Sequence, residues 1–152
     1  MVPQPVAGQP GRFLVDGTWG TINPIALAPG VRTVGELEVI AHIERGLPVI
    51  DSRRAEFFSA VTIPGARSVP HTETREREGD FDRAVDTILF CNGPQCAATP
   101  QAIRALLDAG YPAARLLYYR GGMHDWMTLG LPSVPGAPVD VRLSATKGAV
   151  HD

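Results

Sequence analysis

The sequence of 152 residues lacks several features that mark specialised classes of protein. No apolar run approaches the ~18 residues of a membrane-spanning helix. Lys147 is the only lysine and the formal net charge is −2, so no basic stripe indicates a nucleic-acid surface. Two cysteines are too few for a disulfide framework. The sequence therefore predicts neither a nucleic-acid partner nor a membrane partner.

The start of the chain has neither the basic segment nor the apolar core of a signal peptide. We therefore expect a cytoplasmic protein; a signal peptide already removed would instead indicate the periplasm. Hydrophobic residues make up 44% and charged residues 20%, as in a globular domain with a sizeable core. Glycine and proline are frequent, with 16 and 14 residues, which indicates long loops and tails. We expect an N-terminal extension (1–30), one domain (31–137) and a C-terminal tail (138–152).

Predicted strands and helices alternate along the domain, which is typical of a parallel sheet covered by helices. Thr33 and Glu36 form a capping-box pattern for a helix that ends at Gly46. Thr99 is the expected N-cap of a second helix, with Pro100 at its first position. Further helices are predicted within 53–60 and 121–130, and strands within 12–24, 47–52, 62–70, 86–91 and 114–120.

Both cysteines lie in one stretch, "FCNGPQCAATPQAIRALL" at 90–107. Cys91 ends a predicted strand, at the sheet edge where α/β proteins collect their chemistry. The loop then leads to a helix N-terminus, whose free N–H groups favour thiolate over thiol. Two plainer interpretations stay open: Cys91 as a small buried hydrophobe, and Cys96 as a loop residue without a role. The functional interpretation of Cys96 is a resolving or sulfur-accepting thiol.

Other cysteine chemistries fit this loop less well. A thioredoxin-type site has two residues between its cysteines, and this loop has four. A cysteine phosphatase needs an arginine to bind phosphate, but residues 92–99 carry no charge. Two cysteines alone also lack the second ligand pair of a zinc site, so no metal is expected.

Four segments, in this order, resemble the rhodanese superfamily of sulfurtransferases. Each is a weak match alone, but together they cover roughly residues 31–134. They are "VIDSR" (49–53), "TIPGARSVP" (62–70), "ILFCNGPQC" (88–96) and "YYRGGMHDWMTLGLPSV" (118–134).

The resemblance implies a five-stranded parallel sheet with helices on both faces. It implies that the Cys91 thiolate takes a sulfane sulfur from a small donor, such as thiosulfate, and becomes a persulfide. A thiol or cyanide would then accept the sulfur, with no cofactor. It also implies that Asp51 and Arg53 form an ion pair that braces the strand end. The loop that would hold the substrate comprises Asn92, Gly93, Pro94, Gln95, Ala97, Ala98 and Thr99, with the amides of 92–97 cradling the outer sulfur.

The sequence departs from the commoner Cys-x-x-Gly-x-Arg-Ser loop of the family. Pro94 stands at the usual glycine and Cys96 at the usual arginine, so the chain resembles a subset with Cys-Asn-Gly-x-x-Cys loops. The interval from Cys91 to Gly110 is also about two residues longer than usual. A dianionic donor would then depend on Arg53 or Arg120, which follows the last predicted strand.

Two other functions remain as alternatives. One is a redox or sensing module in which Cys91 and Cys96 form a reversible disulfide; the other is a rhodanese-like binding module without catalysis. His71 and His124 are candidate proton donors, although a lone histidine is more often structural or exposed. Of the two tryptophans, Trp126 is expected in the core and Trp19 in the N-terminal extension.

Overall fold

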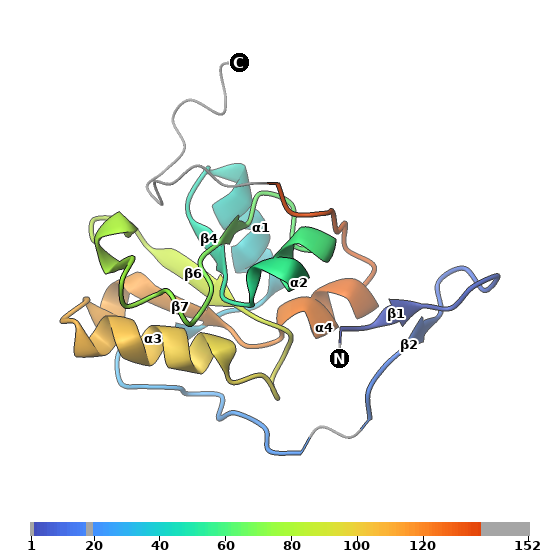
Figure 1. The fold of residues 1–152 in the computed structure, drawn as a ribbon, viewed down its shortest axis with the longest axis horizontal. Coiled ribbons are helices and arrows are strands. Elements are labelled where there is room, and N and C mark those ends of the chain that lie inside the picture. The colour runs from blue at the N-terminus through green and yellow to red at the C-terminus, as the bar shows by residue number, and fades with distance from the viewer. Residues whose placement is uncertain (1, 18–19, 138–152) are drawn as a thin grey trace.

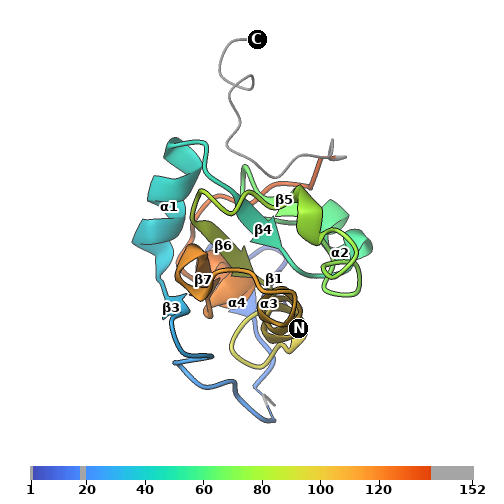
Figure 2. The same cartoon turned by 90° about the vertical axis from the view of Figure 1, so that its left-hand side faces the viewer.

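A computed structural model describes residues 2–17 and 20–137. Five parallel strands form one sheet in the order β3-β7-β6-β4-β5. The predicted five-stranded parallel sheet with helices on both faces is confirmed (Figures 1 and 2). The strands are β3 (Arg32–Thr33), β4 (Val49–Asp51), β5 (Arg67–Ser68), β6 (Thr87–Phe90) and β7 (Leu116–Tyr119). The helices are α1 (Glu36–Glu44), α2 (Ala55–Ala60), α3 (Ala98–Asp108) and α4 (Gly122–Thr128), with short 3-10 turns at Glu78–Asp80 and Ala113–Arg115.

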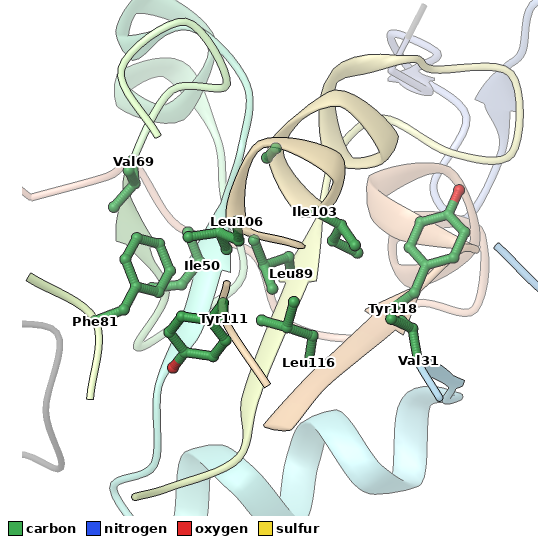
Figure 3. Close-up of a cluster of buried hydrophobic side chains, with 11 residues drawn as sticks. Val31, Ile50, Val69, Phe81, Leu89, Ile103, Leu106, Tyr111, Leu116 and Tyr118 are labelled. Atoms are coloured by element: carbon green, nitrogen blue, oxygen red, sulfur yellow. The ribbon is translucent and has the colours of Figure 1, made fainter. Parts of the chain in front are cut away.

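The central strands are buried on both faces, because their side chains alternate between two apolar clusters. On one face, Ile103 and Leu106 of α3 lie over the sheet (Figure 3). Leu89 of β6 and Leu116 of β7 belong to the same cluster on the sheet side. This cluster fixes α3, and therefore the loop that precedes it, against the centre of the sheet.

On the opposite face, α1 and α4 pack against the sheet. Val39 of α1 and Met123 and Trp126 of α4 share a buried cluster with Phe90 and Tyr119. Trp126 is 2% exposed, so its predicted place in the core is confirmed. The start of α4 is thereby held close to the carboxyl ends of β6 and β7.

The N-terminal extension adds a small hairpin beside α4 (Figure 1). Strands β1 (Gln4–Pro5) and β2 (Phe13–Leu14) pair antiparallel, apart from the main sheet. Phe13 is half-buried and packs, with Val2, against the α1–α4 cluster. The strand predicted within 12–24 is therefore present as β2. Trp19 and the predicted tail at 138–152 lie outside the described residues.

The predicted start of the first helix is wrong. Thr33 belongs to β3, where it pairs with Tyr118 of β7, and its hydroxyl donates to the Ile25 carbonyl. Gly35 is the N-cap instead, and its N–H donates to the Glu38 carboxylate at 3.1 Å. Pairing with β7, which is distant in sequence, has overridden the local capping pattern. The predicted stop at Gly46 is confirmed, with φ +68 just beyond the helix.

Candidate active site

Three strands end side by side at the carboxyl edge of the sheet. The register pairs Asp51 of β4 with Phe90 of β6, and Phe90 with Tyr119 of β7. Cys91 follows β6 directly, and residues 92–97 connect it to α3. The structure therefore places Cys91 at the edge where open parallel sheets hold their sites.

Cys91 is buried, with 2% of its surface exposed. The Thr99 N–H donates to its Sγ at 3.4 Å, and the thiol donates to the Cys96 carbonyl at 3.6 Å. Cys96 is partly exposed, and both cysteines are free thiols. An N–H from the first turn of α3 thus points at the Cys91 sulfur, an arrangement that favours negative charge there.

The pKa values of the two thiols are shifted in opposite directions. Burial raises the pKa of Cys91 well above its usual range, and the neighbouring Cys96 sulfur adds to this effect. Interaction with the Cys91 side chain lowers the pKa of Cys96 to about 6, although burial acts against it. The N–H groups of Ala98 and Asn92 and the charge of His71 lower it further. Cys96 is therefore the more acidic of the two thiols, while the Cys91 thiol donates to the Cys96 carbonyl.

A tight turn shapes the loop between the two cysteines. The Cys96 N–H donates to the Gly93 carbonyl at 3.0 Å, so this N–H is not free for a substrate. A Cβ on Gly93 would lie 2.8 Å from Gln95 Oε1 and 3.2 Å from the His124 Cβ. The close packing explains a glycine here. Of the N–H groups of 92–97 that were expected to cradle a sulfur, that of Asn92 acts on the Cys96 sulfur, as does the N–H of Ala98 just beyond them.

Thr99 does not cap α3, contrary to the sequence prediction. The helix begins at Ala98, its N-cap is Ala97, and no side chain makes a capping hydrogen bond. Thr99 lies inside the first turn, where N–H groups have no partner within the helix. The Cys91 sulfur accepts from the Thr99 N–H and takes the place of a capping oxygen.

Asp51 and Arg53 form a buried ion pair beneath the loop. The Arg53 Nη2 lies 2.6 Å from Asp51 Oδ2, and Thr62 Oγ1 donates to the same carboxylate at 2.8 Å. The guanidinium also donates to the Asn92 side chain at 3.3 Å and to the Val61 carbonyl at 2.5 Å. The pair thus connects β4 to the first loop residue after Cys91. Asp51 compensates the positive charge of Arg53, so Arg53 contributes little attraction for an anionic sulfur donor.

Arg120 contacts the N-terminal extension. Its Nε and Nη2 donate to the Asn23 carbonyl at 2.9 and 2.7 Å. The Asn23 N–H donates to the Pro94 carbonyl at 2.8 Å, and its Nδ2 donates to the Cys96 carbonyl at 2.7 Å. Arg120 is therefore linked to the cysteine loop through the extension, and an anion-binding role for it stays a prediction.

The start of α4 is packed directly against the loop. The Met123 N–H donates to the Cys91 carbonyl at 3.0 Å and the His124 N–H to the Asn92 carbonyl at 2.8 Å. Gly122 has φ +57, and a Cβ there would lie 2.3 Å from the Cys91 carbonyl oxygen. The tight turn at the start of α4 thus depends on Gly122, since Gly121 has an ordinary helical φ of −62.

The two candidate histidines contact different segments near the loop. His71 is half-buried and contacts the Ser52 carbonyl through Nδ1 at 3.2 Å. Its charge acts on Cys96, as its effect on that pKa shows. His124 packs beside Gly93, and its Nδ1 lies 3.0 Å from the Asp125 carboxylate. His71 is thus the histidine whose charge acts on the acidic thiol.

The described residues supply no cluster of three or more His, Cys, Asp and Glu side chains that could hold a metal ion. Within residues 2–17 and 20–137, no helix has the length and apolar character to cross a membrane.

The matching family model is described as a rhodanese-like domain, and it covers residues 36–129. The chain belongs to the rhodanese family. This domain is of the sulfurtransferase type, and its boundaries fall inside the 31–137 expected from the sequence.

Among curated proteins, the chain is 35% identical over 103 residues to the HTH-type transcriptional regulator Rv0324 of Mycobacterium tuberculosis. The match covers 67% of this chain and 44% of the regulator, so the chain spans less than half of that relative.

Two solved structures illustrate the fold. A thiosulfate sulfurtransferase from Pseudomonas aeruginosa superposes with a TM-score of 0.59 and 25% identity, covering 78% of this chain and 22% of that one. The rhodanese-related protein of Thermoplasma volcanium has a TM-score of 0.54 and 19% identity, covering 68% and 97%. Both similarities support the fold of the rhodanese-like domain.

Two residues near the sulfurs were not predicted from the sequence. Asn23 contacts the loop from the extension, and Tyr118 lies behind it, with the Asn23 Nδ2 3.5 Å from its hydroxyl. Burial raises the pKa of Tyr118 to about 12, and the two cysteines contribute to this rise. In Figure 3 the Tyr118 hydroxyl points away from the apolar cluster. The Asn-Pro dipeptide at 23–24 signals a turn, but no local pattern indicates a partner 73 residues away.

Proposed function

We propose that this rhodanese-like domain is a sulfurtransferase that carries a sulfane sulfur as a persulfide on Cys91. The observation that carries the proposal is the position of Cys91 in the fold. It ends the central strand β6 of a rhodanese-like domain, and the first turn of α3 directs an N–H to its sulfur. The proposed partners are a small sulfur donor, such as thiosulfate, and a thiol or cyanide acceptor.

The cysteine pair supplies a route for the proton. The pKa of Cys91 is raised and that of Cys96 is lowered, so in this proposal Cys96 ionises first and its thiolate is the base for the Cys91 thiol. As the Cys91 sulfur attacks the outer sulfur of thiosulfate, its proton passes to Cys96. The sulfur–sulfur bond of the donor breaks and sulfite leaves with the electron pair. The products are an anionic Cys91 persulfide, a neutral Cys96 thiol and sulfite, so atoms and charge balance.

The persulfide then reacts with the acceptor. A thiolate or cyanide attacks the outer sulfur, and Cys91 leaves as a thiolate that regains the proton from Cys96. The Thr99 N–H stabilises negative charge on Cys91 during this step. We propose the cytoplasm as the location, since its reductants keep both thiols free.

The test is sulfur loading followed by mass spectrometry. Reduced protein is mixed with thiosulfate, and Cys91 should gain one sulfur atom. Cys91→Ser should lower thiosulfate–cyanide turnover by about three orders of magnitude. Cys96→Ser should slow loading at pH 7 and recover at alkaline pH, where Cys91 ionises without a base. A sulfur adduct that survives Cys91→Ser would contradict the proposal.

A second function is supported by one comparison and one contact. The chain resembles a transcriptional regulator, and the Cys91 sulfur lies 3.6 Å from the Cys96 carbonyl oxygen. In a redox sensor, peroxide would oxidise the Cys96 thiolate to a sulfenic acid and release hydroxide. Cys91 would then displace water to form the disulfide. Thiol counting after peroxide treatment tests this: loss of both thiols in wild type, with both recovered on reduction, supports the sensor, whereas two thiols that stay countable contradict it.

A further inference from the structure

The segment before β3 contains one residue that turns toward the active site. Residues 20–22 and 24–26 are exposed, whereas Asn23 between them is half-buried. Ile22 and Ile25 are 48% and 68% exposed, so apolar burial does not hold this segment in place. Its attachment at this point is instead polar and centred on Asn23.

The extension crosses the carboxyl edge of the sheet from one face to the other. Phe13 packs with the α1–α4 cluster, while Leu27 and Ala28 pack with the α3 cluster. The blue segment in Figure 1 follows this route from the hairpin toward α3. Asn23 lies between these two anchors, where the chain passes the cysteine loop.

Asn23 holds two peptide groups of the loop in one orientation. Its N–H binds the Pro94 carbonyl and its side chain binds the Cys96 carbonyl. In a trans peptide the next N–H points opposite to the carbonyl, and the described residues include no cis peptide bond. The N–H groups of Gln95 and Ala97 are therefore directed away from Asn23. Neither donates to a backbone carbonyl in the described part of the chain outside helices and strands.

The Cys96 carbonyl has a second contact, with the reactive residue. It accepts from the Cys91 thiol at 3.6 Å as well as from Asn23 at 2.7 Å. The Asn23 carbonyl is in turn fixed by two hydrogen bonds from Arg120, at the end of β7. A chain of contacts thus runs from the sheet through Asn23 to the carbonyl that orients Cys91.

We propose that Asn23, outside the 36–129 match to the family, is a positioning residue for sulfur transfer at Cys91. The inference rests on the proposed function. Asn23 orients the loop peptides so that free N–H groups face the incoming sulfur, and it keeps the loop closed over Cys91.

The test compares Asn23→Asp and Asn23→Ala with wild type, using Thr21→Ala as the matched control. Asn23→Asp preserves shape and main-chain contacts but replaces the Nδ2 donor with an acceptor. Thr21 is exposed in the same segment and outside the catalytic machinery. Each protein is measured for the rate of sulfur loading, for iodoacetamide alkylation of Cys91, and for Tm. Fragmentation mass spectrometry separates the labels on the two cysteines.

Both Asn23 variants should load sulfur about tenfold more slowly at saturating thiosulfate, with little change in the thiosulfate concentration that gives half the maximal rate. Alkylation of Cys91 should accelerate several-fold in the same variants, because the loop opens. Tm should fall by no more than about 4 °C, and Thr21→Ala should match wild type throughout. Opposite changes in loading and alkylation are what a positioning role produces.

Two results would overturn the inference. If loading and alkylation both accelerate, Asn23 only covers Cys91; if neither changes by more than about twofold, Asn23 does not order the loop. If wild type loads no sulfur, the proposed function fails by itself. The alkylation rates of Cys91 then test the role of Asn23 alone. If Cys91 is alkylated as slowly in Asn23→Ala as in wild type, Asn23 does not order the loop.

Discussion

The rhodanese-like domain and the N-terminal extension contribute to the site in different ways. The domain supplies Cys91, Cys96 and the brace of Asp51 and Arg53, all positioned by strand ends between two apolar clusters. The extension supplies Asn23, attached through hydrogen bonds to carbonyls and with little buried apolar surface around it. Changes in the domain should therefore affect folding, whereas changes in the extension should affect mainly the geometry of the loop.

The strongest test of this difference removes the buried brace. Arg53→Met leaves the Asp51 carboxylate buried without its partner and should lower the free energy of unfolding by about 3–5 kcal/mol. Arg115→Met is the control, because its ion pair with Asp86 is exposed and contributes about 0–1 kcal/mol. Urea unfolding measures both. Equal losses in the two variants would mean that the brace is no more important than a surface pair.

A second test concerns the contact of α4 with the loop. Gly122→Ala should cost about 3 kcal/mol, because its φ of +57 is unfavourable and its Cβ would overlap the Cys91 carbonyl. Gly130→Ala, at the other end of α4, has φ +76 but no atom within 4 Å of the new Cβ, and should cost about 1 kcal/mol. Thermal unfolding compares them. Similar costs in the two variants would show that the cysteine loop moves to accommodate the Cβ at position 122 without loss of stability.

The third test examines the acidity of the cysteine pair. The pKa of Cys96 lies near 6, so its alkylation rate should rise between about pH 5 and 7 and then level off. Cys91→Ala removes the side chain whose interaction lowers the pKa of Cys96, so the midpoint should move to higher pH. At pH 6.5 the rate should then fall by several-fold to about tenfold. A midpoint that stays near 6 would assign the acidity to the loop N–H groups instead.

The smallest effect is expected in the extension. Phe13→Ala should cost about 1 kcal/mol, because this ring is only half-buried against the α1–α4 cluster. Phe90→Ala, the same change in the fully buried strand β6, should cost about 3–5 kcal/mol. Denaturant unfolding of the two variants measures the ratio. A cost at Phe13 equal to that at Phe90 would make the hairpin part of the core and remove the distinction drawn above.

The parts of the fold that the sequence predicts well are those with a local pattern. Apolar runs predicted β4, β6 and β7. The order of four motifs predicted the family and the position of Cys91 after a strand. The predicted glycine stop at Gly46 also holds, with a positive φ. Local patterns succeed here because backbone conformation and burial agree along each segment.

The errors arise where a distant contact overrides the local pattern. Thr33 carries a good capping sequence, but its backbone pairs with β7. Thr99 is a good N-cap type, yet the Cys91 sulfur uses its N–H within the first turn. Asn23 has its partners in the loop and at the end of β7, so nothing in its own neighbourhood reveals its contacts.

The link between Asn23 and Arg120 has a consequence for biosynthesis. The two residues are 97 positions apart, and Asn23 is made first. At the usual pace of translation, roughly 5–20 residues per second, Asn23 waits about 5–20 s before Arg120 is added to the chain. Contacts of such long range form late in folding, after local helices. We therefore expect the cysteine loop to gain its last restraint only once β7 is in place.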